Sequence, residues 1–415
     1  MSQDRLIAMS RRTNRVYFLD RTAVAGGQSA LYDVDGDTTL VALVPVEAED
    51  RDEYFRKAGA LIKKGTRNRN FAFPLELLYC PKDPNKPVAI LLERLPGSPL
   101  EELLFPVERE ELGLHWDEHE FRIVAREIAK HFAFSEHQGF CQNDTHPGQY
   151  LVEWGADGTP TRVCRVDLLA ASFWHDNVYY GSEKTHWEYV PPELQHLRRR
   201  VGLKGFHIPR EADRFGLASL LFALLTGGKH TDYAGGEAEP EKRVERKEFA
   251  VISMPKDARV PDAVEEAYYR LPPEVRVLFE RAFLGDPKNR PSPVEWLSAL
   301  KKWPQPADNT APWSLPLPSI TAPLGSLWRR VKAWAGAQSV GLIGAVALVA
   351  AVCLVPRGGP EPLPPPPAQP PATPPVAAGA NAHDVETTSA HDFPELPPPR
   401  RRARNPDAVT LLNQR

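Results

Sequence analysis

The chain has 415 residues and a formal net charge of −3, with 42% hydrophobic and 25% charged residues. This length corresponds to roughly two or three domain-sized units, and the hydrophobic share is enough for a packed core in at least one of them. Nucleic-acid binding rests on clustered, uncompensated Lys and Arg, so the near-neutral balance argues against nucleic acid as the main partner. The four cysteines show no CxxC spacing, so the sequence indicates neither a structural metal site nor a disulfide scaffold.

The N-terminal part of the chain predicts a small antiparallel sheet. Strands are expected where apolar and β-branched residues run between turn signals such as Gly26-Gly27 and Asp35-Gly36. These stretches are 15–23, 29–34, 38–44, 73–80 and 88–94. A helix is expected over 52–64, and amphipathic helices dominate from Leu100 onward. The sequence therefore predicts an α+β protein with a small β-rich lobe followed by a larger helical lobe.

The composition changes sharply after Trp303. Up to that residue, charged and apolar residues mix as they do in a globular domain, whereas prolines recur every few residues from Pro304 to Pro323. Frequent proline blocks regular helix and is typical of a linker. We therefore expect the folded domain to end at residue 303 and a Pro-rich juxtamembrane linker to cover 304–332.

Residues 333–356 carry no charge and contain a long apolar run. At about 1.5 Å per residue, some twenty of them cover a hydrocarbon core of about 30 Å, so this segment predicts one transmembrane helix. A buried core helix is the alternative, but no second domain follows that would bury it. Arg329, Arg330 and Lys332 precede the segment and only Arg357 follows it closely, so the positive-inside rule places the N-terminal domain in the cytoplasm.

The segment 357–415 predicts a disordered, Pro-rich extracytoplasmic tail, because it has too little apolar sequence to form a core. Its basic cluster at 400–404 either contacts an acidic polymer or lipid, or is simply solvated. The first thirty residues contain arginines but no continuous apolar stretch, which argues against a cleaved secretory signal. The expected location is a cytoplasmic (inner) membrane, crossed once.

Two carboxylates and an amide follow one another at informative spacings. Asp144 precedes Gln149 by five residues, with Pro147 and Gly148 bending the chain between them, and Asp167 ends an apolar segment further on. Oxygen ligands of this kind hold Mg²⁺ and orient an attacking hydroxyl for phosphoryl transfer. The alternative is structural, with Asp144 capping a loop and Asp167 accepting hydrogen bonds at a strand end.

Residues 15–303 resemble the protein-kinase family, and the matches run in the family's order. Asp144 falls at the catalytic-loop Asp of the His-Arg-Asp motif, Gln149 at the metal-binding Asn, and Asp167 at the Asp of Asp-Phe-Gly. Glu93 lies where the family's hinge contacts adenine through backbone groups. The resemblance implies a two-lobed kinase-like fold with ATP and Mg²⁺ as ligands.

Three further matches concern the architecture of the large lobe. Pro191-Pro192-Glu193 corresponds to the family's Ala-Pro-Glu, Asp213 to the Asp of the central helix, and Arg290 to the arginine of the Arg-Pro-Ser element. The resemblance implies an ion pair between Arg290 and Glu193, and structural rather than catalytic roles for these three residues.

The cation that the family uses on nucleotide phosphates is missing. The family's third strand carries a lysine in Val-Ala-Ile-Lys, which pairs with a glutamate on the next helix; here Val44 replaces the lysine and Lys57 stands near the glutamate position. No Lys or Arg occurs between Arg21 and Arg51. A unit charge about 4 Å from a phosphate oxygen contributes on the order of 4 kcal/mol at an effective dielectric of 20. Losing most of it predicts a rate roughly a hundred- to a thousandfold lower.

Other family positions also depart from the pattern. Gly26 and Gly27 stand in place of the Gly-x-Gly-x-x-Gly loop, and they fit either a phosphate contact or a simple hairpin turn. Asn143 replaces the arginine that pairs with a phosphorylated activation segment, and Gln149 is one methylene longer than Asn. Leu169 stands where the family has glycine, which restricts the backbone there. Binding of ATP and Mg²⁺ is accordingly expected to be weak or absent.

The sequence thus predicts a membrane-anchored pseudokinase that signals by binding a cytoplasmic protein partner. One alternative is an active, divergent serine/threonine kinase in which Lys57, Lys63 or Lys64 reaches the phosphates. Another is a small-molecule phosphotransferase, because Asp144-Thr145-His146-Pro147-Gly148 is similar to the loop of the aminoglycoside phosphotransferases. Those enzymes lack the Pro-Pro-Glu and Arg-Pro-Ser matches.

Overall fold

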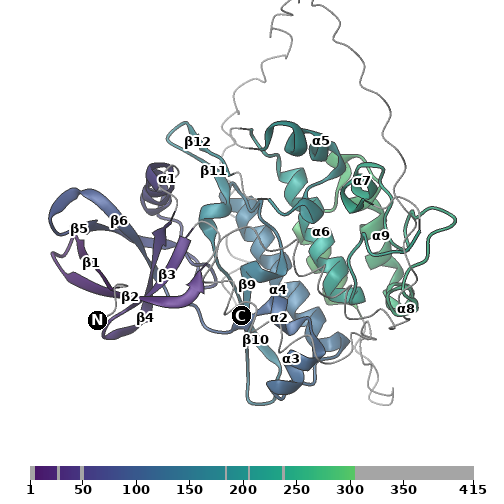
Figure 1. The fold of residues 1–415 in the computed structure, drawn as a ribbon. Helices are drawn as coiled ribbons and strands as arrows, with labels where there is room; N and C mark the ends of the chain where they lie inside the picture. Colours follow the sequence, from purple (N-terminus) through teal and green to yellow (C-terminus); the bar gives the residue numbers. More distant parts are fainter. Residues whose placement is uncertain are drawn as a thin grey trace, which may run out of the picture. The chain divides into compact units, whose positions relative to one another are not determined.

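The computed structural model describes residues 5–25, 29–46, 51–182, 185–203, 206–235 and 239–303, which belong to one compact unit (Figure 1). The predicted linker, membrane segment and tail lie outside these ranges, as do Gly26 and Gly27. Within the described ranges, no helix combines the length and the apolar character that crossing a membrane requires.

The β-rich lobe is a closed barrel of antiparallel strands, joined in the order β1-β2-β3-β4-β6-β5. The strands are β1 (Arg5–Ser10), β2 (Val16–Ala25), β3 (Ser29–Val34), β4 (Asp37–Pro45), β5 (Pro74–Cys80) and β6 (Asp83–Glu93). Small and aliphatic side chains, among them Ala8, Leu19, Ala42 and Leu78, are fully buried in its interior. β1 lies before residue 15, where the sequence placed the start of the domain, and closes the barrel by pairing with both β2 and β5.

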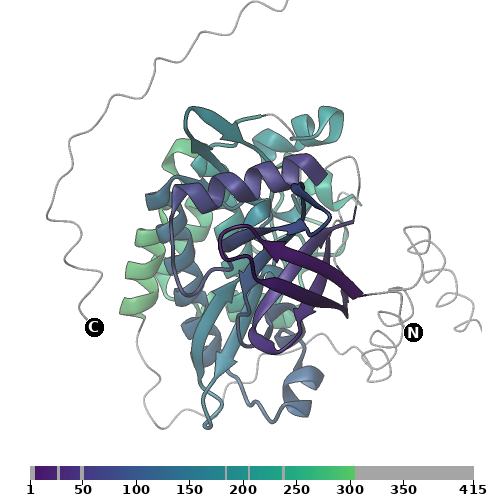
Figure 2. The same cartoon turned by 90° about the vertical axis from the view of Figure 1, so that its left-hand side faces the viewer.

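Helix α1 (Arg51–Lys64) packs on the barrel and matches the predicted helix over 52–64. Its buried face contributes Phe55, Ala58 and Leu61 to a core that also contains Ile90 of β6 and Leu168 of the second lobe. Figure 2 shows this helix beside the barrel strands. Because the same cluster contains residues of both lobes, packing of α1 connects the barrel to the candidate site.

The second lobe is helical, as predicted. Its helices are α2 (Leu100–Leu103), α3 (Pro106–Glu111), α4 (Glu118–Gln138), α5 (Pro192–Val201), α6 (Arg210–Thr226), α7 (Pro240–Glu245), α8 (Asp262–Arg270), α9 (Pro273–Phe283) and α10 (Pro293–Lys302). Helix α4 begins at a capping box between Asp117 and Glu120 and ends at the left-handed Gly139. The central helix α6 is buried along most of its length, with Phe215 and Phe222 packed in an aromatic core.

Short strands in the second lobe were not all expected, because helices were predicted to dominate after Leu100. They are β7 (Ser98–Pro99), β8 (Phe140–Cys141), β9 (Tyr150–Trp154), β10 (Pro160–Arg165), β11 (Ser172–His175) and β12 (Val178–Tyr180). They form two small sheets, in the orders β10-β9-β7 and β12-β11-β8. Single-turn 3-10 helices follow β8, β10 and β12 at Pro147–Gln149, Leu168–Ala170 and Trp187–Tyr189, and a further one lies at Pro287–Asn289. These short elements position the candidate site.

The connection between the lobes runs from Glu93 to β7. Gly97, in this connection, has a φ of +109°, and a Cβ atom there would lie 2.5 Å from the carbonyl oxygen of Val152 on β9. Only glycine combines this backbone conformation with so close an approach. The sequence Pro96-Gly97 therefore fixes the path of the connection against β9.

Candidate functional site

The loop between β8 and β9 brings Asp144 and Gln149 together. The Nε2 atom of Gln149 donates a hydrogen bond of 2.8 Å to Oδ2 of Asp144, and Nε2 of His146 lies 3.7 Å from the same oxygen. The Asp144 side chain is 13% exposed and Gln149 is buried. Because the amide nitrogen of Gln149 faces Asp144, its oxygen remains as the group that can bind a cation.

Asp167 follows β10 and has a left-handed backbone, with φ of 49° and ψ of 57°. Such a conformation in a residue other than glycine is disfavoured by about 1–3 kcal/mol and persists only where the surrounding structure imposes it. The next two residues, Leu168 and Leu169, are buried in the core shared with α1. The backbone N–H of Val166 donates to the carbonyl oxygen of Gln149 at 2.9 Å, which places Asp167 beside the Asp144 loop.

These residues suit a magnesium ion that is held partly by a nucleotide. Mg²⁺ binds one or two carboxylates and completes its shell with phosphate oxygens and water, so it needs no cage of protein ligands. Among the described residues, no three His, Cys, Asp or Glu side chains converge as a metal cluster. Asp167 with the amide oxygen of Gln149 is the donor set that would hold such an ion, and the chemistry of these oxygens fits Mg²⁺.

Asp213 holds the Asp144 loop from the side of helix α6. Its carboxylate accepts hydrogen bonds from the backbone N–H of Gln142 at 2.6 Å and of Asn143 at 3.1 Å. Burial raises the pKa of Asp213 to about 6, although these two bonds act in the opposite direction. Asn143 has a left-handed backbone with φ of 53°. Asp213 therefore stabilises an otherwise unfavourable backbone just before Asp144.

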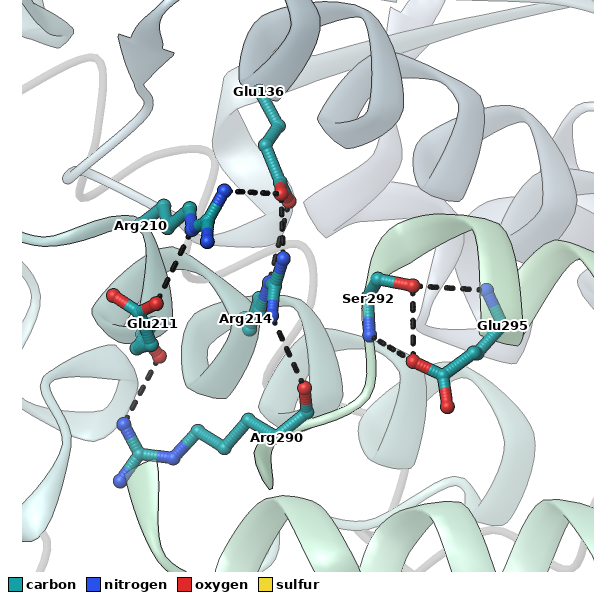
Figure 3. Close-up of polar contacts among 7 residues, drawn as sticks. All are labelled: Glu136, Arg210, Glu211, Arg214, Arg290, Ser292 and Glu295. Atoms are coloured by element: carbon teal, nitrogen blue, oxygen red, sulfur yellow. Dashed lines mark hydrogen bonds and ion pairs between the residues drawn. The ribbon is translucent and has the colours of Figure 1, made fainter. Parts of the chain in front are cut away.

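Arg290 and Glu193 form the predicted ion pair. The two guanidinium nitrogens Nη1 and Nη2 donate to the two carboxylate oxygens at 2.6 and 2.8 Å. Arg290 also donates to the carbonyl oxygens of Glu211, at 3.0 Å, and Ala282, at 3.2 Å. Figure 3 shows the Arg290 side chain directed at Glu211, while its own carbonyl accepts from Arg214. The pair ties the start of α5 to the start of α6 and the end of α9.

Val44, which the resemblance aligns with the family's lysine, lies on β4 opposite Ala30 of β3. Lys57 on α1 is 5% exposed, and its Nζ donates a hydrogen bond of 2.6 Å to the carbonyl oxygen of Gly181, just after β12. Lys64 reaches the carbonyl of Trp174 on β11 at 3.5 Å, and Lys63 is exposed. The ammonium groups of Lys57 and Lys64 thus contact the segment after Asp167.

Glu93 lies at the end of β6, opposite Leu40 of β4, with an exposed side chain. The following N–H, of Arg94, donates to the carbonyl of Thr39 at 2.8 Å. Glu93 therefore begins the connection between the lobes. The predicted phosphate contacts at Gly26 and Gly27 lie outside the described residues.

Two features of the site were missed by sequence reasoning. Arg165 at the end of β10 is completely buried behind the Asp144 loop. A second group of side chains extends from His146 to His186, whose rings are 5.6 Å apart, and on to Glu188 and Lys229, which pair at 2.6 Å. Burial lowers the pKa of His186. The sequence feature that could have pointed to Arg165 is its place as a charged residue inside the apolar run 163–166.

No known family model matches the chain. It is 26% identical over 305 residues to protein kinase YegI of Escherichia coli (strain K12), covering 69% of this chain and 45% of the relative. It is also 26% identical over 292 residues to the protein of the same name from Escherichia coli O157:H7, covering 66% of this chain and 43% of the relative. The match therefore spans less than half the length of these curated relatives.

Among solved structures, the chain is similar to Rad53 residues 1–466 in complex with AMP-PNP. The identity is 15% and the TM-score is 0.45, with 68% of this chain and 64% of the other covered. The curated relatives, together with the order of the motifs along a fold of β-rich and helical lobes, support placing this chain in the protein kinase-like superfamily.

Proposed function

We propose that this chain is a membrane-anchored, protein kinase-like signalling protein, a pseudokinase that acts by binding a cytoplasmic protein partner. The observation that carries this proposal is the contact of Lys57 with the carbonyl oxygen of Gly181 at 2.6 Å, next to a strand in which Val44 replaces the lysine. The cation of α1 is buried against the segment after β12. The carbonyl oxygen of Gly181 accepts one of its hydrogen bonds, which holds this cation at the segment after β12.

An active, divergent serine/threonine kinase remains the second candidate. It is favoured by the 2.8 Å bond between Gln149 and Asp144 and by the left-handed backbone of Asp167. In such an enzyme Asp144 would accept the proton of the substrate hydroxyl, and Asp167 with Gln149 would hold Mg²⁺. The ion would offset charge on the phosphates. A small-molecule phosphotransferase is the third candidate, resting on the His146 loop alone.

A phosphate-transfer assay on the full-length chain in detergent distinguishes the first two candidates. With Mg-ATP labelled on the γ-phosphate and a broad protein substrate, we expect the same incorporation for the wild type and for Asp144→Ala. Asp83→Ala, at an exposed position on the barrel hairpin, is the matched control. Incorporation that is lost in Asp144→Ala and kept in Asp83→Ala would identify an enzyme. If Lys57→Met then abolishes it as well, Lys57 supplies the cation.

Nucleotide binding is tested separately by thermal denaturation. A protein that only binds partners shows no shift of its midpoint with Mg-ATP, or a shift that Asp167→Ala leaves unchanged. A shift that requires both Mg²⁺ and Asp167 would instead show that the chain binds the ATP and Mg²⁺ that its resemblance to protein kinases implies.

Anchoring in the membrane is proposed from the uncharged segment 333–356. In an expressing bacterium, we expect the full-length chain to stay with membranes after a carbonate wash and a chain lacking 333–356 to be released. Retention of the shortened chain would contradict anchoring by this segment. Protease added outside a spheroplast should cut the tail and leave the kinase-like domain intact.

A further inference from the structure

Arg165 is a buried cation that the proposed function does not use. It is the last residue of β10, and none of its side chain is accessible to solvent. Burying a guanidinium is unfavourable unless charge or hydrogen bonds compensate for it. Nε and Nη1 of Arg165 have no hydrogen-bond partner among the described residues, and the guanidinium lies 5.3 Å from the centre of the Tyr150 ring. Nη2 makes two hydrogen bonds to backbone carbonyl oxygens.

Those bonds go to the backbone of the Asp144 loop. Nη2 of Arg165 donates to the carbonyl oxygen of Asp144 at 3.1 Å and to that of Gln142 at 3.4 Å. Asp213 accepts the N–H groups of Gln142 and Asn143 from the other side. The backbone of 142–144 is therefore held by a buried cation on its carbonyl groups and by a buried anion on its amide groups.

The backbone of Arg165 links this loop to the first lobe. Its N–H donates to the carbonyl of Asn70 at 2.7 Å, and its own carbonyl accepts from the N–H of Ala72 at 2.9 Å, in the connection between α1 and β5. Two residues later the chain reaches Asp167. A single residue thus touches the loop of Asp144, the segment of Asp167 and the first lobe.

We propose that Arg165 is a positioning residue: its guanidinium fixes the backbone of 142–144, and through it the carboxylate of Asp144, from behind the site. Asn143 offers no cation in this loop, and Arg165 provides one from β10. The inference concerns the same site as the proposed function. Its test follows the loop itself, so the result does not depend on whether phosphate is transferred.

The test is hydrogen exchange of the segment 140–146 in the full-length chain, corrected for intrinsic exchange rates, for the wild type, Arg165→Met and Arg165→Lys. A hydrogen bond to a charged group contributes enough that losing the clamp should reduce protection of this segment at pH 7 by about tenfold or more in Arg165→Met. Arg165→Lys keeps a cation and should recover most of the protection. Arg162→Met is the matched control, because Arg162 lies on the same strand and its side chain donates hydrogen bonds to Asn70 and to the carbonyl of Arg69, away from the Asp144 loop.

A pH profile separates positioning from a general structural effect. The two N–H bonds lower the pKa of Asp213, so protonation favours a local opening that breaks these bonds while Asp213 stays buried, and protection should decrease as the pH falls through about 6. Arg165 lowers that pKa; Arg165→Met should therefore move the midpoint to higher pH. The other titratable groups that act on Asp213, or that it acts on, are Glu136, Cys141, Tyr150 and Tyr179. They are unchanged in the variants.

Two results would overturn the inference. One is unchanged protection and an unchanged midpoint in Arg165→Met. The other is an equal loss of protection in α6, residues 210–226, which would show that Arg165 only stabilises the whole lobe. Loss confined to 140–146 with rescue by lysine supports positioning, whatever the phosphate-transfer assay gives.

Discussion

Arg290 and Arg281 make ion pairs of similar length in very different surroundings. Arg290 lies 2.6 Å from Glu193 with its side chain 1% exposed, whereas Arg281 lies 2.8 Å from Glu295 with both side chains more than 40% exposed. Water competes for the exposed pair and screens its charges, but it reaches the guanidinium of Arg290 hardly at all. Similar distances therefore imply different contributions to stability.

We expect Arg290→Met to lower the free energy of unfolding by about 2 kcal/mol, because Glu193, which is 35% exposed, loses its partner and the carbonyl groups of Glu211 and Ala282 lose a buried donor. Arg281→Met should lower it by about 1 kcal/mol or less. Urea denaturation of the two variants beside the wild type measures both values. Equal losses would mean that burial of Arg290 is not what gives its pair with Glu193 its strength.

The sequence predicted the residues whose motifs fix their order and spacing along the chain. It did not predict the residue whose role depends on an unusual environment in the folded protein. The pairs Asp144–Gln149 and Arg290–Glu193 follow from their spacing and order, and the structure brings each pair together. Arg165 was not predictable, since an arginine in a short strand ordinarily faces solvent. Its burial depends on the carbonyl groups of a loop more than twenty residues earlier in the chain, which periodicity does not reveal.

At the scale of elements, the sequence predicted the strands that pair with their neighbours in the chain. The strands β2, β3 and β4 follow one another with turns between them, and the sequence located all three within two residues at each end. The sequence did not predict β1, because β1 closes the barrel by pairing with β5, far along the chain. Its exposed Ile7, beside half-buried and buried neighbours, also breaks the alternation that indicates a strand.

The hairpin β11–β12 had a signal that was not used. Asp176 and Asn177 separate two aromatic runs and both have positive φ, at 48° and 62°. Asp and Asn tolerate this backbone, and a two-residue loop of this kind joins antiparallel strands with the correct twist. The hairpin presents the carbonyl of Trp174 to Lys64, and that of Gly181, just beyond it, to Lys57. The turn residues therefore help to set the contact on which the proposed function rests.

At the scale of the whole molecule, two buried histidines link stability to pH. His131 on α4 lies 4.8 Å from the ring of Phe71 and stacks on Tyr150, whereas His230 packs among Phe215, Phe249 and Phe283. Burial lowers the pKa of each to about 3, from a usual value of 6.5. A histidine of this kind binds a proton more weakly when the protein is folded. Its contribution to stability is complete above pH 6.5 and is lost as the pH falls from there toward 3.

Asp213 has the opposite effect over part of the same range. Burial raises its pKa from 3.8 to about 6, so the folded protein binds this proton more strongly than the unfolded protein does. Acidification from pH 7 to 5 therefore removes part of the unfavourable free energy of burying the charged carboxylate. The linkage relation gives a loss of roughly 2 kcal/mol for each histidine over this interval and a gain of roughly 1 kcal/mol for Asp213. The histidines outweigh the aspartate, so these three groups together make the protein less stable at pH 5 than at pH 7.

We therefore expect the combined variant His131→Phe and His230→Phe to lose less stability than the wild type between pH 7 and pH 5, by roughly 4 kcal/mol. Phenylalanine keeps the ring packing and removes the proton that unfolding takes up. Urea denaturation at the two pH values gives this difference, and His115→Phe, at an exposed position, should leave it as in the wild type. If the combined variant and the wild type lose the same stability, the acid sensitivity comes from paired carboxylates, because protonation of the two buried rings would then contribute nothing measurable.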